Sequence, residues 1–314
     1  MDFSHFAPKT KFHSRAYIKH DKSYDQLNKS ILDAITINGG IYGIPVGYAP
    51  RSVIFNQGLA TELGLTIDTE NMTWSEVLRL AKELESQDGL YLFKQMNGLE
   101  GLLISMLIPN MPDLIDLQNK TCDLRQDWFM NLLQQLKEVS SLGCLNDDYG
   151  VQGDKNYLFL EKINRSFLGA VNDYNYLQPG ITYLPPFSGE INRNRVAYTT
   201  VMYSISNNSQ NKDAAWEFLS YLIAEDTGTL DSLTKDEVPL NNASVDKLIS
   251  QSNSKPSQEY LDRFCAFLDV DYLYDMSYYK KDLADPIMEY LLGTTTLARA
   301  ITKAEYNIML RMHE

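Results

Sequence analysis

Carboxylates are the most abundant groups in this sequence that could carry out chemistry. The chain holds 41 Asp and Glu residues, with close pairs at Asp147–Asp148 and at Asp269 with Asp271. Two carboxylates that flank a glycosidic bond are the machinery of a glycoside hydrolase. Both pairs fall on expected loops, where a solvated surface explains them. We therefore expect no enzyme, and a glycoside hydrolase is the alternative.

Short catalytic motifs are absent from the sequence. It contains no G-x-S-x-G elbow, no Walker A loop, no H-E-x-x-H and no G-x-G-x-x-G. Each of these motifs positions a nucleophile, a phosphate or a metal through fixed spacing. We expect no catalytic residue and no cofactor.

Cysteine and histidine spacing predicts neither a metal site nor a disulfide framework. Cys122, Cys144 and Cys265 lie far apart, none belongs to a C-x-x-C pair, and the four histidines are not in ligand spacing with them. Cys144 and Cys265 lie in the apolar runs LGCL and FCAFL. This setting predicts buried thiols that pack as small hydrophobic groups.

Charge, hydropathy and length limit the classes of protein to which this chain could belong. The formal net charge of -13 argues against a nucleic-acid binder, because no basic patch is present to release counterions from phosphates. No stretch approaches the roughly 20 apolar residues of a membrane span. The first residues, MDFSHFAPKTKFHSR, lack the apolar region of a signal peptide, so we see no export signal in this chain. A length of 314 residues suits two lobes of ordinary size.

The elements that must position any site alternate between helical and strand patterns. Apolar residues at helical spacing predict helices in these segments: 23–36, 74–84, 98–110, 126–142, 211–224 and much of 257–314. Short runs rich in β-branched and aromatic residues predict strands at 41–46, 52–56, 165–172, 180–187 and 196–206. This alternation predicts an α/β fold.

Two of these helices have clear local signals. TWSE at 73–76 is a capping box that opens a helix, and Trp74 is expected to pack against the lobe. The helix at 211–224 carries Asp213 in its first turn, where a carboxylate favours the helix dipole. Its predicted core-facing residues are Ala215, Phe218, Leu219 and Leu222.

Four segments carry a resemblance to one family. Residues 39–84 contain YGIP at 42–45, FN at 55–56 and TWSE at 73–76. ITYLPPF follows at 181–187, then YSISNNSQNKDAAWEFLSYLIAEDTG at 203–228, with a weaker match in VPLNNASVDKL at 238–248. In this order and spacing they resemble the extracellular solute-binding proteins of bacterial ABC importers, in the branch that handles sugars and oligosaccharides.

The resemblance implies a two-lobed, periplasmic-binding-protein-like fold of type II with hinge strands. Lobe one would hold 1–46 and 201–247, and lobe two would hold 47–195 and 248–314. The hinge crossings would fall near 46–51 and 196–200. Only 41 residues precede Tyr42, fewer than the family has there, which implies an incomplete first lobe. A ligand between the lobes would stabilise the closed state by contacting both.

Ligand residues, by the same resemblance, come from strand ends and the loops after them. The expected ligand residues are Tyr48, Asn172, Asp173, Tyr174, Tyr176, Tyr198 and Tyr279. Tyr48 and Tyr198 lie at the two crossings. Amide, carboxylate and tyrosine groups suit the hydroxyls and C–H faces of a sugar. Packing is the alternative for each tyrosine, and turn formation is the alternative for Asn172 and Asp173.

The implied function is the capture of a carbohydrate, specifically an oligosaccharide. The chain would then deliver this ligand to ABC permease subunits. The family implies a monomeric, lipid-anchored protein at the outer face of the membrane or in the periplasm. A sensor that presents its ligand to a signalling receptor uses the same clamp and remains open. A polyamine, an iron complex or a phosphate ester also remains open, although Tyr and Asn candidates favour a neutral polyol over a cation or an anion.

Overall fold

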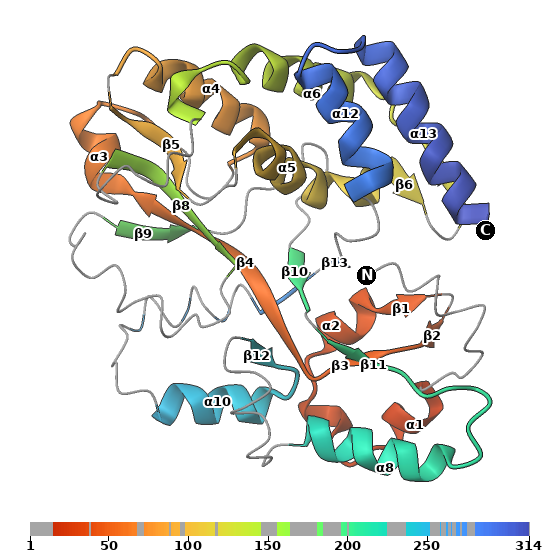
Figure 1. Ribbon diagram of the computed structural model, residues 1–314. Helices are drawn as coiled ribbons and strands as arrows, with labels where there is room; N and C mark the ends of the chain where they lie inside the picture. The colour runs from red at the N-terminus through yellow and green to blue at the C-terminus, as the bar shows by residue number, and fades with distance from the viewer. Residues whose placement is uncertain are drawn as a thin grey trace. The chain divides into compact units, whose positions relative to one another are not determined.

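The computed structural model describes most of the chain (Figure 1). The described residues are 15–37, 39–67, 72–87, 89–94, 98–116, 119–145, 156–163, 181–184, 196–199, 201–224, 237–251, 258, 262, 265, 268–270, 272–274 and 280–313. The predicted strand at 165–172 lies outside them, as does the end of the one predicted at 180–187.

The chain divides into two compact units. Unit 1 comprises Met1–Arg51, Ile163–Asn175 and Arg195–Asp275, and unit 2 comprises Ser52–Lys162, Tyr176–Asn194 and Met276–Glu314. The predicted lobes differ from these units at 47–51, 163–175 and 248–275, which belong to the predicted lobe two but fall in unit 1, and the lobe boundaries stay a prediction.

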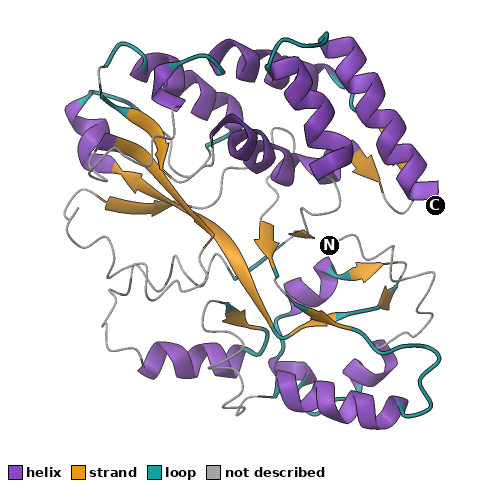
Figure 2. Ribbon diagram, in the orientation of Figure 1, coloured by secondary structure: helices purple, strands orange, loops and turns teal. Residues whose placement is uncertain are grey.

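Unit 1 is built from short helices and short strands, which Figure 2 separates by colour. Its elements are α1 (Arg15–Lys19), η2 (Tyr24–Gln26), α2 (Lys29–Ala34), β1 (Thr36–Ile37), β2 (Gly40–Ile41), β3 (Ile44–Pro45), β10 (Val196–Tyr198), β11 (Met202–Tyr203), α8 (Lys212–Ile223), β12 (Val238–Pro239), α10 (Asn242–Gln251) and β13 (Tyr272–Tyr274).

Unit 2 holds the three longest helices of the described residues. Its elements are α3 (Gln57–Glu62), α4 (Trp74–Leu84), β5 (Tyr91–Lys94), α5 (Gly98–Leu114), β6 (Ile115–Asp116), β7 (Thr121–Cys122), α6 (Asp127–Val139), η3 (Gly143–Leu145), β9 (Ile181–Leu184), a π-helical turn η6 (Lys280–Ala284), α12 (Asp285–Leu291) and α13 (Leu297–His313). β8 (Tyr157–Ile163) pairs in parallel with β5 and ends at the unit boundary.

β4 (Gly47–Asn56) is the strand in which the chain passes from unit 1 to unit 2, because the boundary falls between Arg51 and Ser52. Its first half pairs antiparallel with β12 and β10, and its second half pairs antiparallel with β9. The predicted strand at 52–56 is therefore the second half of a longer strand. The predicted strand at 41–46 is wrong in extent, since β2 and β3 are separate.

Gly43 of the YGIP segment lies close to β11 and to Ser204, which follows it. β3 pairs antiparallel with β11, with Ile44 opposite Tyr203. A Cβ atom at Gly43 would lie 3.0 Å from the Ser204 Oγ and 3.5 Å from the Tyr203 carbonyl oxygen. A Cβ atom here would require a small movement of the Ser204 side chain, whereas its distance from the carbonyl oxygen is that of an ordinary van der Waals contact.

The predicted single strand at 196–206 is wrong, since the structure contains two short strands, β10 and β11. The chain leaves the strand conformation at Thr199, which is 2% exposed. The Thr199 Oγ1 lies 3.0 Å from the Gly47 carbonyl oxygen and 3.1 Å from that of Val201, and shares its proton between them. A buried hydroxyl that bonds the backbone locally competes with the sheet ladder.

α4 begins where the capping box predicted. The Thr73 Oγ1 accepts a hydrogen bond from the Glu76 amide at 3.4 Å, which satisfies one of the free donors of the first turn. Trp74 is 2% exposed and packs against Phe93, with ring centroids 6.2 Å apart. The packing interpretation of Trp74 is confirmed.

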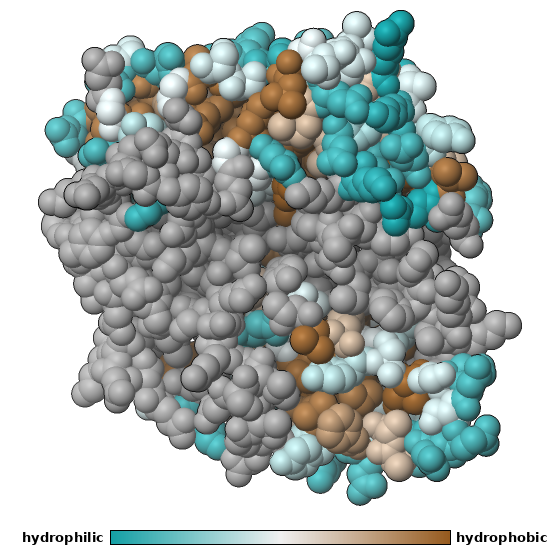
Figure 3. All heavy atoms as spheres, viewed as in Figure 1, coloured by the Kyte–Doolittle hydropathy of each residue, from teal (hydrophilic) through white to brown (hydrophobic). Residues whose placement is uncertain are grey.

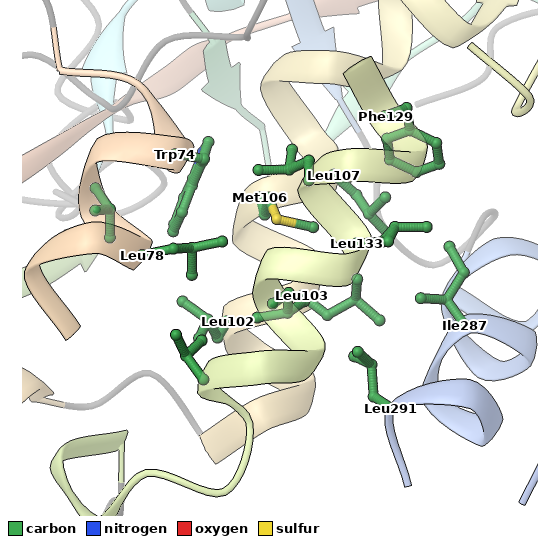
Figure 4. Packing of buried hydrophobic residues seen from close by; sticks show 14 of the residues in the cluster. Trp74, Leu78, Leu102, Leu103, Met106, Leu107, Phe129, Leu133, Ile287 and Leu291 are labelled. Carbon is green, nitrogen blue, oxygen red and sulfur yellow. The ribbon is translucent and has the colours of Figure 1, made fainter. Parts of the chain in front are cut away.

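Unit 2 has a continuous apolar core beneath α4, α5, α6 and α12 (Figure 4). The labelled side chains that point toward one another are Trp74, Leu78, Leu102, Leu103, Met106, Leu107, Phe129, Leu133, Ile287 and Leu291. α5 continues to Leu114 through Pro109 and Pro112, past the predicted end at residue 110. Burial on several sides outweighs the local cost of these prolines.

α8 lies close to its predicted range, and the predicted burial of Leu219 and Leu222 is confirmed. Its buried residues are Trp216, Leu219, Leu222 and Ile223. Phe218 is 57% exposed, so its predicted place in the core is wrong. Trp216 packs against Tyr17 of α1 at a centroid distance of 5.6 Å, which fixes the rotation of the helix. In the surface view of Figure 3, apolar side chains are visible in the region of α8.

The helix predicted at 23–36 is shorter in the structure. η2 and α2 replace it, with Asn28 as the N-cap of α2. The apolar positions Leu27, Ile31, Leu32 and Ile35 are all buried. The spacing therefore identified the inward face correctly, although it did not locate the start of the helix.

None of the helices in the described part of the chain is long and apolar enough to cross a membrane.

Replacement of Leu133 should test the unit 2 core. Leu133 on α6 is fully buried, so Leu133→Ala should lower the free energy of unfolding by about 2–5 kcal/mol through lost burial and the cavity left behind. The matched control is Leu310→Ala on α13, where the side chain is 50% exposed and the change should stay within about 0.5 kcal/mol. Urea unfolding of both variants measures this, and equal effects would contradict the core assignment.

Candidate functional site

The structure describes only two of the seven predicted ligand residues. Tyr48 is described with its side chain, and Tyr198 is described by its position in β10. The other predicted ligand residues lie outside the described part of the chain: Asn172, Asp173, Tyr174, Tyr176 and Tyr279. These five stay predictions.

The two predicted crossings lie side by side in unit 1. Ala197 pairs with Pro50, and Tyr198 pairs with Ala49, so β10 runs antiparallel to the first half of β4. A third strand, β13, pairs in parallel with β10, with Tyr198 opposite Tyr274. The sequence predicted helices over much of 257–314 and not this strand.

Tyr48 is completely buried at the start of β4. Its hydroxyl accepts a hydrogen bond from the Asn28 Nδ2 at 2.9 Å and lies 3.4 Å from the Leu268 carbonyl oxygen, to which it donates. A buried ring with its hydroxyl engaged in this way has no polar atom directed at a solute. The geometry therefore favours the packing alternative for Tyr48 over direct ligand contact.

Burial also affects the acidity of this hydroxyl. Loss of hydration raises the pKa of Tyr48 far above its usual value, because the charged phenolate is disfavoured in a buried site. The hydrogen bond from Asn28 lowers this pKa, and the negative charge of Asp269 raises it further. Tyr48 therefore remains a neutral hydrogen-bonding group throughout the physiological pH range.

Asn28 is the centre of this hydrogen-bond network, and its side chain is bonded on both ends. Its Nδ2 donates to Tyr48 at 2.9 Å and to the Leu268 carbonyl oxygen at 2.8 Å. Its Oδ1 accepts from the Ile31 amide at 3.2 Å and from the Ser30 Oγ at 2.8 Å. An amide side chain has two donor hydrogens and two acceptor lone pairs, so all four are used.

Ser30 extends the network to the chain that leads into β13. Its Oγ accepts a hydrogen bond from the Val270 amide at 2.9 Å. Asn28, Ser30 and Tyr48 thus connect α2, β4 and residues 268–270, three segments that are distant in sequence. Sequence reasoning missed Asn28 and Ser30, although an Asn directly before an apolar helical repeat is an available N-cap signal.

This network is suited to holding strands and not to catalysis. It contains hydroxyl, amide and carbonyl groups, and none of these is ionised. Of the predicted carboxylate pairs, the structure describes only Asp269, which is exposed. Among the described residues no group of three or more His, Cys, Asp or Glu side chains could hold a metal ion.

The three cysteines are free thiols in different settings. Cys144 is buried, as predicted, and its Sγ donates to the Ala81 carbonyl oxygen at 3.2 Å. Cys265 is exposed, so its predicted burial is wrong. Desolvation raises the pKa of Cys122 to about 12 and that of Cys144 to about 11, and it also raises the pKa of Cys265.

Comparison with known proteins places the fold. No protein-family model matches the sequence. The sugar-binding protein MalE from Xanthomonas citri is similar in structure, with a TM-score of 0.68 and 16% identity over 98% of this chain and 80% of that one.

Two further solved structures show the same likeness. A putative oligosaccharide periplasmic-binding protein from Synechococcus has a TM-score of 0.68 and 13% identity over 98% of this chain and 82% of that one. Maltose-bound MalE3 from T. maritima has a TM-score of 0.63 and 16% identity over 98% of this chain and 81% of that one. The predicted α/β fold of the periplasmic-binding-protein type is confirmed.

Thiol labelling should distinguish the three cysteines. In the native protein iodoacetamide should modify Cys265 and spare Cys122 and Cys144, because only Cys265 is exposed. The raised pKa of Cys265 leaves little thiolate at neutral pH, so its rate should rise about tenfold per pH unit up to that pKa. Mass spectrometry of peptides measures both effects, and Cys144 reacting as fast as Cys265 would contradict the burial described here.

Proposed function

We propose that this chain is a solute-binding subunit of an ABC importer that captures a carbohydrate and delivers it to membrane permease subunits. The observation that carries this proposal is the fold, which the chain shares with sugar-binding and oligosaccharide-binding proteins over nearly its whole length. The YGIP, TWSE and DAAWEFL segments support it independently, because they are features of the amino-acid sequence and do not depend on the similarity of the folds.

The proposed ligand is an oligosaccharide. One structural neighbour is a maltose complex, and another is described as an oligosaccharide-binding protein. Asn172, Asp173, Tyr174, Tyr176, Tyr198 and Tyr279 are the proposed contacts. Tyrosine rings stack on the C–H faces of sugar rings, and amide and carboxylate groups bind the hydroxyls.

The remaining parts of the proposal follow from the same family. The chain binds its solute without converting it, so it is not an enzyme. It acts as a monomer that a lipid anchor holds outside the cell membrane, and its partners are the permease subunits. Neither a metal nor a cofactor takes part.

A thermal melt with a sugar panel tests the proposal. The panel contains glucose, maltose, cellobiose, trehalose, lactose and maltotriose in millimolar excess over the protein. A sugar at 100 times its dissociation constant should stabilise the native state by about 2.7 kcal/mol, since only the folded chain binds it. For a chain of this length that corresponds to a shift of a few degrees in Tm. A cooperative melt that no sugar shifts would contradict carbohydrate capture and would favour another solute.

Variants of the predicted contacts identify the site. Tyr174→Ala and Asn172→Ala should each weaken binding of the sugar found in the panel by about tenfold or more, because each removes about 1.4 kcal/mol or more of contact energy. The matched control is Tyr221→Ala on α8, an exposed tyrosine that should leave affinity unchanged. Titration calorimetry measures all three, and equal affinity in the variants and the control would remove residues 172 and 174 from the site.

A further inference from the structure

Three segments near the unit boundary are fastened to one another inside unit 1, which means that hydrogen bonds join them. They are the first half of β4, β10 and β13. The first half of β4 is bonded on two sides, with Tyr48 opposite Val238 of β12 and Ala49 opposite Tyr198 of β10. β10 is bonded in turn to β13. These ladders place the segments from residues 47, 196 and 272 next to one another.

Side chains reinforce these ladders. The Thr199 hydroxyl bonds to the Gly47 carbonyl oxygen, which joins the end of β10 to the start of β4. Asn28 bonds to Tyr48 and to the Leu268 carbonyl oxygen, and Ser30 bonds to the Val270 amide. Asn28 is 8% exposed, Tyr48 is fully buried and Thr199 is 2% exposed, so water competes little for these bonds.

We propose that Asn28 and Tyr48 are positioning residues for solute binding, which hold the unit 1 ends of the crossing segments in one arrangement without contacting the solute. This proposal rests on the proposed function. It also changes where the hinges are expected. The predicted hinge crossings near 46–51 and 196–200 contain residues 47–50 and 196–199, which belong to the fastened part. The chain would flex beyond these residues and not within them.

The proposed effect on affinity follows from the fraction of molecules that have the arrangement able to bind. If the fastening is lost, the crossing segments sample several arrangements, and only a fraction of molecules has the arrangement that binds. The apparent dissociation constant then rises by the inverse of that fraction, whichever solute is bound. Substitution of a residue that contacts the solute has a different effect. It weakens binding only of those sugars that carry the hydroxyl that the residue recognises.

Asn28→Asp is the sharpest variant, and the chain offers a matched control for it. The substitution retains the side-chain oxygen that caps α2 and removes the donors to Tyr48 and Leu268. Asn56 is also a buried N-cap, with its Oδ1 accepting from the Leu59 amide at 3.0 Å and its Nδ2 donating to the Tyr157 carbonyl oxygen at 3.4 Å. Asn56→Asp therefore makes the same chemical change outside the network.

Hydrogen exchange of single amides, followed by NMR without any sugar, tests the fastening. In Asn28→Asp the Val270 amide should exchange about tenfold faster than in the wild type, because repulsion between the new carboxylate and the Leu268 carbonyl loosens residues 268–270. The Ile31 amide should keep its protection, since its cap remains. Asn56→Asp should leave Val270 unchanged. Unchanged exchange at Val270 in Asn28→Asp, or equal acceleration in both variants, would overturn the fastening.

Affinity measurements test the positioning role. Tyr48→Phe retains the ring and removes the hydroxyl, and it should weaken every sugar that shifts the wild-type melt by the same factor, within about twofold. Affinity equal to that of the wild type would overturn the positioning role, and a loss confined to one sugar would show direct contact. If no sugar in the panel binds, the proposed function fails, whereas the exchange experiment still decides whether Asn28 fastens these segments.

Discussion

The fully bonded side chain of Asn28 is the constraint on which the architecture of unit 1 depends. Its oxygen caps α2, and its nitrogen bonds Tyr48 at the start of β4 and the backbone that leads to β13. A buried amide with an unmet hydrogen bond is costly, so the three segments are held in the one arrangement that satisfies it. The strands by which the chain leaves and enters unit 1 are thereby fixed next to one another.

Unit 2 contains an extensive apolar core. Its core is continuous across α4, α5, α6 and α12, and the cluster includes Leu78, Leu103 and Leu133, all fully buried. Apolar burial is non-directional and roughly proportional to the area removed from water, whereas a buried amide requires particular partners at particular distances.

Local chemistry made several elements predictable from the sequence. Thr73 and the apolar repeat after it identified α4, and the buried Leu27, Ile31, Leu32 and Ile35 were recognised from helical spacing. The errors arose where long-range partners decide. Phe218 turned outward because Trp216 packs on Tyr17, and Cys265 is exposed although its neighbours in sequence are apolar.

The candidate site was predictable to a smaller extent for the same reason. The family resemblance brought Tyr48 and Tyr198 to attention, and the structure indeed places both in adjacent strands. The hydrogen bonds of Tyr48 could not be read from the sequence, because its partners Asn28 and Leu268 lie 20 and 220 residues away. No local pattern relates residues at such separations.

Carbohydrate capture is the central claim, and calorimetric titration of the purified chain with maltose and maltotriose tests it most directly. A chain that captures carbohydrate should give a saturable heat with one sugar bound per chain and a negative heat-capacity change from the burial of apolar surface. A folded chain that gives no saturable heat with either sugar, or with any other sugar of the panel, would contradict it.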